Sequence, residues 1–323
     1  MTACEKEGAA SVSVRVVGGD GGGTRLRLAL ADGAGRILAR RTGPPGLVEA
    51  GKEDRAATRV VAELQALASQ SGTALPVDAL CVGLAGVGRP ERARLVQTAL
   101  VAAGVAGRVQ VVTDAAVALR HAFGSRSGIL LIAGTGSVAL ARDSSGAVRR
   151  VGGWGSLLGD EGSGYGLGLG GLRAALRGWE GRGPGTALSH ELSQALGVPS
   201  PAGFLSWTEE AGKGMVAALA PLVVRMAQEG DEVARGLVEG AVAALVAHVE
   251  ALMPDPDPGR AGQGSGATRH RPPVALAGGL LSTGGPLRDA ILAILATRGF
   301  PVREGPVDAA RGAVDLALES LPN

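Results

Sequence analysis

The first third of the chain alternates short apolar runs with polar or glycine-rich turns, a pattern typical of β-strands joined by hairpins. Residues 25–30 read Arg-Leu-Arg-Leu-Ala-Leu, and this two-residue period places the leucines on one face of a strand. The strands predicted in this half are Val12–Val17, Arg25–Leu30, Arg36–Arg41, Ala79–Leu84 and Arg108–Val112. The helices predicted beside them are Glu49–Ser71, Pro90–Ala103 and Ala115–Phe123. This order predicts a mixed sheet with helices packed on it.

The same pattern restarts near residue 128 and predicts a second sheet. Its strands are Gly128–Ala133, Val138–Arg142, Val148–Val151 and Pro273–Ala277. The remaining chain is predicted to be largely helical over 164–252, with further helices over 286–298 and Ala309–Leu321. Residues 254–272 are rich in proline, glycine and serine and are predicted to form a mobile loop.

Two glycine-rich hairpins therefore occur about 115 residues apart, and each opens a three-stranded unit. This repeat predicts a duplicated α/β fold with a cleft between its two domains. The N-terminal domain is predicted over 12–124 and the C-terminal domain over 125–307. The last helix, over 308–321, is expected to pack back on the N-terminal domain.

Composition narrows the classes of function. Lys and Arg total 32 against 30 Asp and Glu, and this balance argues against a nucleic-acid surface. The chain has no apolar run of 18 residues and no apolar segment near its first residue, which predicts a cytoplasmic protein without a membrane partner. The two cysteines, Cys4 and Cys81, argue against a disulfide framework and a cysteine-built metal site.

Residues 152–168 form a dense glycine cluster, because eight of these seventeen residues are glycine. Between the glycines lie Trp154, the adjacent acids Asp160 and Glu161, and the only tyrosine, Tyr165. Such a segment loses much backbone entropy on ordering and gains little by packing. A ligand that the backbone approaches closely is therefore the predicted reason for it, and a plain loop before a helix is the alternative.

The first hairpin turn, Gly18–Thr24, is predicted to bind a polyphosphate. Gly22 and Gly23 let the backbone approach phosphate oxygens, and the Thr24 hydroxyl can donate to them. Asp20 suits a hydrated Mg²⁺, since that ion binds few carboxylates. The turn is not a dinucleotide fingerprint, because a strand and not a helix follows it. An ordinary tight hairpin is the alternative.

Three further segments complete the predicted site. The second turn, with Thr135, Gly136 and Ser137, has the same design and could hold the outer phosphates. Asp114 follows a strand and is either a helix N-cap or a general base that accepts a proton from a substrate hydroxyl. After the strand Pro273–Ala277, a pair of glycines would let a flat adenine lie on the backbone at a helix N-terminus: Gly278 and Gly279.

These segments, in this order, resemble the phosphate hairpins, connecting aspartate and adenosine glycines of the actin/hexokinase/Hsp70 ATPase superfamily. The Gly-Gly-Trp-Gly and Gly-Asp-Glu-Gly-Ser motifs within residues 152–163 are similar to the signature of N-acetylglucosamine kinases in the BadF/BadG/BcrA/BcrD-type ATPase family. The resemblance covers roughly residues 14–320. It implies a duplicated ribonuclease-H-like fold that closes about a cleft, ATP and Mg²⁺ as cofactors, and a homodimer.

The resemblance also implies an activity and its residues. It implies an ATP-dependent kinase that phosphorylates an amino sugar, N-acetylglucosamine first among them, at the 6-hydroxyl, with Asp114 as general base. Thr24 and Thr135 match threonines that contact ATP. The residues that match the sugar site are Asp114, Gly153, Trp154, Gly155 and Asp160.

One departure from the family keeps alternatives open. The family usually has a sugar-contacting asparagine after the third strand, and the segment Thr42–Val48 contains none. Glucosamine, another hexose, or ATP hydrolysis without a sugar therefore remain possible. An activator that holds an iron–sulfur cluster is disfavoured, since Cys4 lies in the tail and Cys81 in a strand. A sugar sensor would usually carry a further DNA-binding domain.

Overall fold

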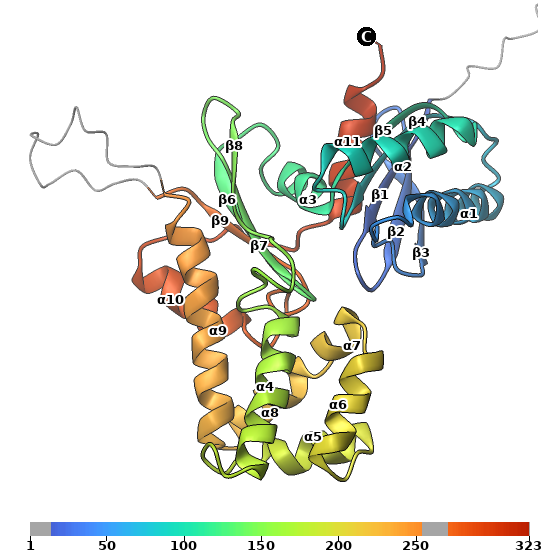
Figure 1. The fold of residues 1–323 in the computed structure, drawn as a ribbon. Coiled ribbons are helices and arrows are strands. Elements are labelled where there is room, and N and C mark those ends of the chain that lie inside the picture. Colours follow the sequence, from blue (N-terminus) through green and yellow to red (C-terminus); the bar gives the residue numbers. More distant parts are fainter. Residues whose placement is uncertain (1–13, 254–270, 323) are drawn as a thin grey trace, which may run out of the picture. The chain divides into compact units, whose positions relative to one another are not determined.

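The computed structural model describes residues 14–253 and 271–322 (Figure 1). Two compact units make up the chain, and each is described by itself. Unit 1 contains the residues up to Val117 and those from Ala309 onward, and unit 2 is Ala118–Asp308. Residues 1–13 lie outside the described residues, as do positions 254–270 of the predicted mobile loop.

Unit 1 is built on a five-stranded sheet in the order β3-β2-β1-β4-β5. Strands β1 and β2 and strands β2 and β3 pair antiparallel, whereas β4 pairs parallel with β1 and β5 with β4. The strands are β1 (Arg15–Gly21), β2 (Leu26–Asp32), β3 (Ile37–Gly43), β4 (Val77–Leu84) and β5 (Ala106–Thr113). This mixed sheet confirms the α/β class predicted from the alternating pattern.

Helices cover both faces of this sheet. Larger side chains such as Leu28, Leu80 and Val82 face α1 (Glu53–Ser71) and α2 (Pro90–Ala102). The alternate positions carry smaller residues, among them Ala29 and Cys81, and face α11 (Ala309–Glu319). Burial raises the pKa of the Cys81 thiol to about 12, so this cysteine stays protonated inside the core.

The first hairpin differs from its prediction. Strand β1 continues through Gly21, so that the turn joining it to β2 is only residues 22–25 and not Gly18–Thr24. Gly18 belongs to the strand, where it pairs with Ala29 and Cys81. A Cβ on Gly18 would lie 2.3 Å from the Val314 nitrogen and 2.4 Å from the Ala310 oxygen of α11. Close helix packing, rather than ligand approach, therefore explains this glycine.

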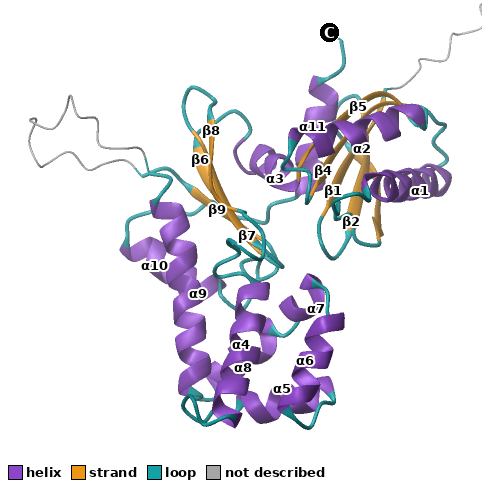
Figure 2. Cartoon of the chain, in the orientation of Figure 1, coloured by secondary structure: helices purple, strands orange, loops and turns teal. Residues whose placement is uncertain are grey.

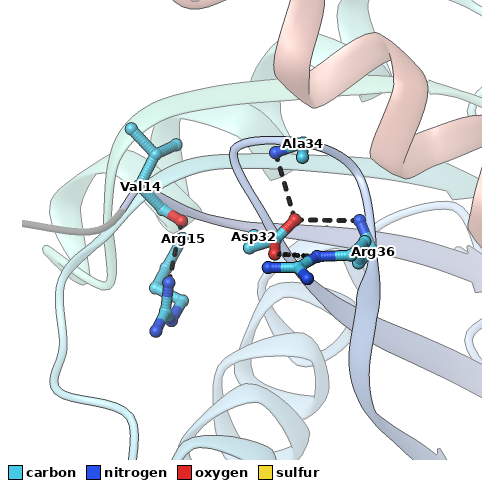
Figure 3. Close-up of polar contacts among 5 residues, drawn as sticks. All are labelled: Val14, Arg15, Asp32, Ala34 and Arg36. Carbon is cyan, nitrogen blue, oxygen red and sulfur yellow. Dashed lines mark hydrogen bonds and ion pairs between the residues drawn. The ribbon is translucent and has the colours of Figure 1, made fainter.

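The next hairpin is closed by the Asp32 carboxylate (Figure 3). Its Oδ1 accepts hydrogen bonds from the backbone nitrogens of Ala34 and Arg36, and its Oδ2 accepts one from the Arg36 Nε. The backbone and side-chain hydrogen bonds from Arg36 hold the pKa of Asp32 below its usual value. The turn is therefore fixed by a charge-assisted network.

Unit 2 repeats the same strand order in its own sheet, β8-β7-β6-β9. Strand β6 pairs antiparallel with β7 and parallel with β9, and an isolated parallel bridge joins Val274 to Val302 where the first sheet has its fifth strand. The strands are β6 (Gly128–Ala133), β7 (Ser137–Arg142), β8 (Val148–Gly152) and β9 (Val274–Ala277). The matching order is the duplication that the two glycine-rich hairpins predict.

The rest of unit 2 is helical, as predicted for residues 164–252 (Figure 2). Its helices are α4 (Gly164–Trp179), α5 (Leu188–Leu196), α6 (Pro201–Glu210), α7 (Lys213–Ala217), α8 (Ala220–Gln228), α9 (Glu232–Glu250) and α10 (Arg288–Thr297). One apolar core joins these helices to the sheet. Within this core, the ring centroids of Trp179 and Phe204 lie 4.8 Å apart. Within the described ranges, none of the helices has the length and apolar content needed to cross a membrane.

Candidate active site

In unit 1, the predicted phosphate turn and Asp114 lie at the same end of the sheet. Gly21 is in register with Leu84 of β4, and Leu84 is in register with Thr113 of β5. The turn and Asp114 therefore both follow the carboxyl ends of parallel strands, where open α/β sheets bind ligands. Two strand spacings, roughly 10 Å in all, separate β1 from β5 at this edge.

The turn at residues 22–25 leaves room for a ligand. The Gly22 nitrogen donates to the Arg25 oxygen at 3.0 Å, and the Gly22 oxygen accepts from the Gly46 nitrogen at 3.0 Å. A Cβ on Gly22 would meet nothing within 4 Å, and Thr24 is exposed. The backbone is thus held from one side and open on another, as a phosphate-binding turn requires.

Asp20 lies in β1 directly before this turn. Its Oδ2 is 3.4 Å from the Arg27 Nη1 on the paired strand, and its side chain is 18% exposed. Among the residues that the structure describes, no group of three or more His, Cys, Asp or Glu side chains could hold a metal ion. A hydrated Mg²⁺ needs only one or two carboxylates beside the phosphates of a substrate, and Asp20 fits that requirement.

Asp114 is the first residue of α3 (Asp114–Phe123), directly after β5. The preceding Thr113 does the capping, because its hydroxyl accepts a hydrogen bond from the Ala116 nitrogen at 3.2 Å. The half-buried Asp114 carboxylate accepts from the Ala115 nitrogen at 2.9 Å. Thr113 and Asp114 therefore each accept from an amide of the first turn of α3.

In unit 2, the second predicted turn is docked on the start of α4. The Gly164 nitrogen donates to the Gly134 oxygen at 2.8 Å, and the Tyr165 nitrogen donates to the Thr135 oxygen at 3.3 Å. These bonds satisfy amides of the first helical turn, which have no partner inside the helix. Backbone hydrogen bonds therefore join the second hairpin directly to the start of α4.

The glycine-rich segment itself is tied down at both ends. The Gly153 nitrogen donates to the Ser137 oxygen at 3.0 Å, and the Ser163 hydroxyl caps α4 by accepting from the Gly166 nitrogen. Between these anchors, Trp154 is 64% exposed, and the Arg150 guanidinium lies 4.3 Å from its ring centroid. The segment thus presents an aromatic ring on a loop whose ends are fixed.

The Asp160 side chain is buried inside unit 2 and does not lie on the surface. It is 3% exposed, its Oδ1 accepts from the Ser137 nitrogen at 3.2 Å, and its Oδ2 lies 2.5 Å from the Lys213 Nζ. The Ser137 hydroxyl also donates to the Glu161 oxygen at 2.7 Å. The carboxylate therefore joins the second hairpin to the glycine-rich segment.

In the pair Gly278 and Gly279, the first glycine is required by packing and the second occupies an open position. A Cβ on Gly278, whose φ is +89°, would lie 2.3 Å from the Ala133 oxygen, whereas a Cβ on Gly279 would meet nothing within 4 Å. A hydrogen-bonded turn follows the two glycines, and the helix predicted over 286–298 is α10, which begins at Arg288. Gly279 can still lie flat against a ligand, without a helix N-terminus beside it.

Sequence reasoning missed Lys213. A signal was available, because 29 of the 32 basic residues are arginine and Lys213 is one of only three lysines. A lysine is a compact point charge, unlike the planar guanidinium of arginine, so the rare lysines were positions worth singling out.

The chain matches a family model and several known proteins. The model of the BadF/BadG/BcrA/BcrD ATPase family matches residues 17–298. An N-acetylmuramic acid/N-acetylglucosamine kinase from Clostridium acetobutylicum is 31% identical over 74% of this chain and 79% of its own length. An N-acetyl-D-glucosamine kinase from Dictyostelium discoideum is 31% identical over 71% of this chain and 76% of its own.

A solved structure resembles the whole chain. It is a candidate N-acetylglucosamine kinase from Chromobacterium violaceum, with a TM-score of 0.79 and 30% identity. The match covers 94% of this chain and 99% of that protein. The family model and this solved structure therefore both match residues in unit 1 and in unit 2.

Proposed function

Because the chain belongs to the BadF/BadG/BcrA/BcrD ATPase family, we propose that it is an ATP-dependent kinase of an amino sugar, with N-acetylglucosamine as its first candidate substrate. The observation that carries this proposal is the glycine-rich segment, which presents the exposed Trp154 while its ends are bonded to the second hairpin and to α4. Gly153, Trp154 and Gly155 are proposed to contact the sugar, together with Asp114 and Asp160.

The nucleotide is proposed to be bound by the two hairpins and the glycine pair after β9. Backbone amides and hydroxyls of the turns would donate to the phosphates, and Gly279 would lie against adenine. Bound Mg²⁺, held by Asp20, would neutralise charge on the phosphates. The residues proposed for this role are Asp20, Gly22, Gly23, Thr24, Thr135, Gly136, Ser137, Gly278 and Gly279.

Asp114 is proposed to act as general base. As the sugar 6-hydroxyl oxygen attacks the γ-phosphorus, its proton passes to the Asp114 carboxylate. The new bond joins the sugar oxygen to phosphorus, the bond from phosphorus to the β–γ bridging oxygen breaks, and ADP leaves. The half-buried carboxylate at the start of α3 supports this role, since Thr113 already caps the helix. We further propose that the protein acts in the cytoplasm as a homodimer.

Two alternatives remain beside N-acetylglucosamine. The segment over residues 44–48 contacts the first hairpin through the Gly46 nitrogen but offers no asparagine for an N-acetyl group. Glucosamine or another hexose is therefore the second candidate substrate, and ATP hydrolysis without a sugar is the third reading.

A coupled assay of ADP release separates these readings. Mg-ATP is supplied with N-acetylglucosamine, glucosamine, N-acetylmannosamine, N-acetylmuramic acid or glucose. We expect an N-acetylated amino sugar to stimulate ADP release most strongly. ADP release that no sugar increases would contradict the kinase and favour the sugar-independent ATPase.

A further inference from the structure

A buried ion pair lies beside the second hairpin of unit 2. The Lys213 Nζ is 2.5 Å from the Asp160 Oδ2, and the other carboxylate oxygen accepts from the Ser137 nitrogen. The Asp160 side chain is almost fully buried, whereas that of Lys213 is 34% exposed. A buried carboxylate without a cation would be strongly disfavoured, so Lys213 is what allows Asp160 to hold the hairpin amide as an anion.

The backbone at Asp160 is strained. Its φ is +64°, which among the described non-glycine residues is a left-handed value found only here. Such a conformation costs free energy and persists when the surroundings fix it, as they do at functional sites. The ion pair and the hydrogen bond to Ser137 provide that fixation.

At Gly136, the absence of a side chain on the second hairpin leaves space for the ion pair between Asp160 and Lys213. A Cβ there would lie 2.5 Å from the Asp160 Oδ1 and 3.1 Å from the Lys213 Nζ. The glycine is therefore required by the ion pair, independently of any ligand. The same geometry places the ammonium group directly against the turn that is proposed to receive phosphates.

Lys213 is held in place by tight helix packing. It begins α7, and α7 lies on the glycine-bearing face of α4. A Cβ on Gly168 would be 2.0 Å from the Val216 oxygen, and one on Gly164 would be 3.2 Å from the Ala217 oxygen. The backbone of α7 therefore packs closely against α4, and Lys213 reaches Asp160 from this packed helix.

We propose that Lys213 is a positioning residue of the nucleotide site, an inference that rests on the proposed function. Its ammonium holds the Asp160 carboxylate on the Ser137 nitrogen and so fixes the hairpin in the shape that accepts ATP phosphates. The contacts run from α4 through α7 to Lys213, then to Asp160 and Ser137. The residue acts through Asp160 and not by touching ATP.

The test is direct binding of Mg-ATP to the full-length Lys213→Met variant, measured by titration calorimetry without sugar. We expect the affinity for Mg-ATP to fall at least about tenfold, because the buried carboxylate loses its partner and no longer holds the hairpin. In the turnover assay, KM for ATP should rise by a similar factor. Lys52→Met is the matched control, since Lys52 pairs with Glu49 on the surface of unit 1, and it should bind Mg-ATP like the wild type.

A double-mutant cycle with Asp160→Asn tests the route of the effect. If Lys213 acts through Asp160, the double variant binds Mg-ATP no more weakly than Asp160→Asn alone. Additive losses would overturn the proposal, since they would mean that Lys213 contacts ATP itself. Wild-type affinity for Mg-ATP in Lys213→Met would also overturn it.

Two further points keep the test decisive. If Lys213→Met does not fold, Lys213→Gln replaces it, because glutamine is polar but carries no positive charge to pair with the Asp160 carboxylate, and it predicts the same loss of ATP affinity. Binding of Mg-ATP needs no sugar, so absence of sugar-dependent turnover would contradict the proposed function while this measurement still decides the role of Lys213.

Discussion

At the residue scale, single glycines in this protein serve two distinct purposes. Gly18, Gly136 and Gly278 are required by atoms that lie where a side chain would begin. Gly22 and Gly279 meet nothing there, so their backbone is open to a ligand. A sequence pattern cannot separate these cases, because both give the same letter.

Gly18→Ala tests the packing reading. The added methyl group would meet the backbone of α11, which must shift, so we expect the free energy of unfolding to fall by about 1–3 kcal/mol. Urea unfolding without nucleotide measures it. Gly22→Ala, at an open position of the same hairpin, should leave stability close to the wild-type value, and an equal loss in both variants would be inconsistent with the packing reading.

At the scale of secondary-structure elements, the two-residue and helical periods predicted the strands and helices well. They could not predict that β1 runs through Gly21, because that extension depends on pairing with Leu26 of β2 and with Leu84 of β4, far later in the chain. They also could not place Lys213 beside Asp160, since α7 reaches the hairpin only through its packing on α4. Long-range contacts, which no local pattern contains, account for what the sequence did not reveal.

The cap of α9 gives a prediction about pH. Burial raises the pKa of Asp231, but hydrogen bonds from the Ala234 and Ala187 nitrogens and the Thr186 hydroxyl outweigh it, so the net pKa is lowered. A carboxyl group with a lowered folded-state pKa stabilises the fold above its unfolded pKa of about 3.9, and this stabilisation is lost as the pH falls through the folded-state pKa.

We therefore expect Asp231→Asn to lower the free energy of unfolding by about 1 kcal/mol at neutral pH. The difference from the wild type should narrow as the pH falls below about 4, as the wild-type carboxylate is protonated. Urea unfolding across this range measures it. A difference that stays constant with pH would show that the charge on Asp231 does not contribute.

At the scale of the whole molecule, both units use one plan. Each sheet places an antiparallel hairpin beside parallel strands, and each gathers its predicted site residues where those strands end. Unit 1 contains Asp20, Thr24 and Asp114, and unit 2 contains the second hairpin, Trp154 and Gly279. This division is consistent with a kinase in which one unit carries the proposed base and the other the sugar signature.

The most direct test of this account is the turnover of Asp114→Asn with the sugar that stimulates the wild type best. We predict that kcat falls by about 100- to 10,000-fold, because no group remains to accept the hydroxyl proton. Thermal unfolding and Mg-ATP affinity should stay near wild-type values, since Thr113 still caps α3. Turnover close to that of the wild type would contradict the assignment of Asp114 as general base.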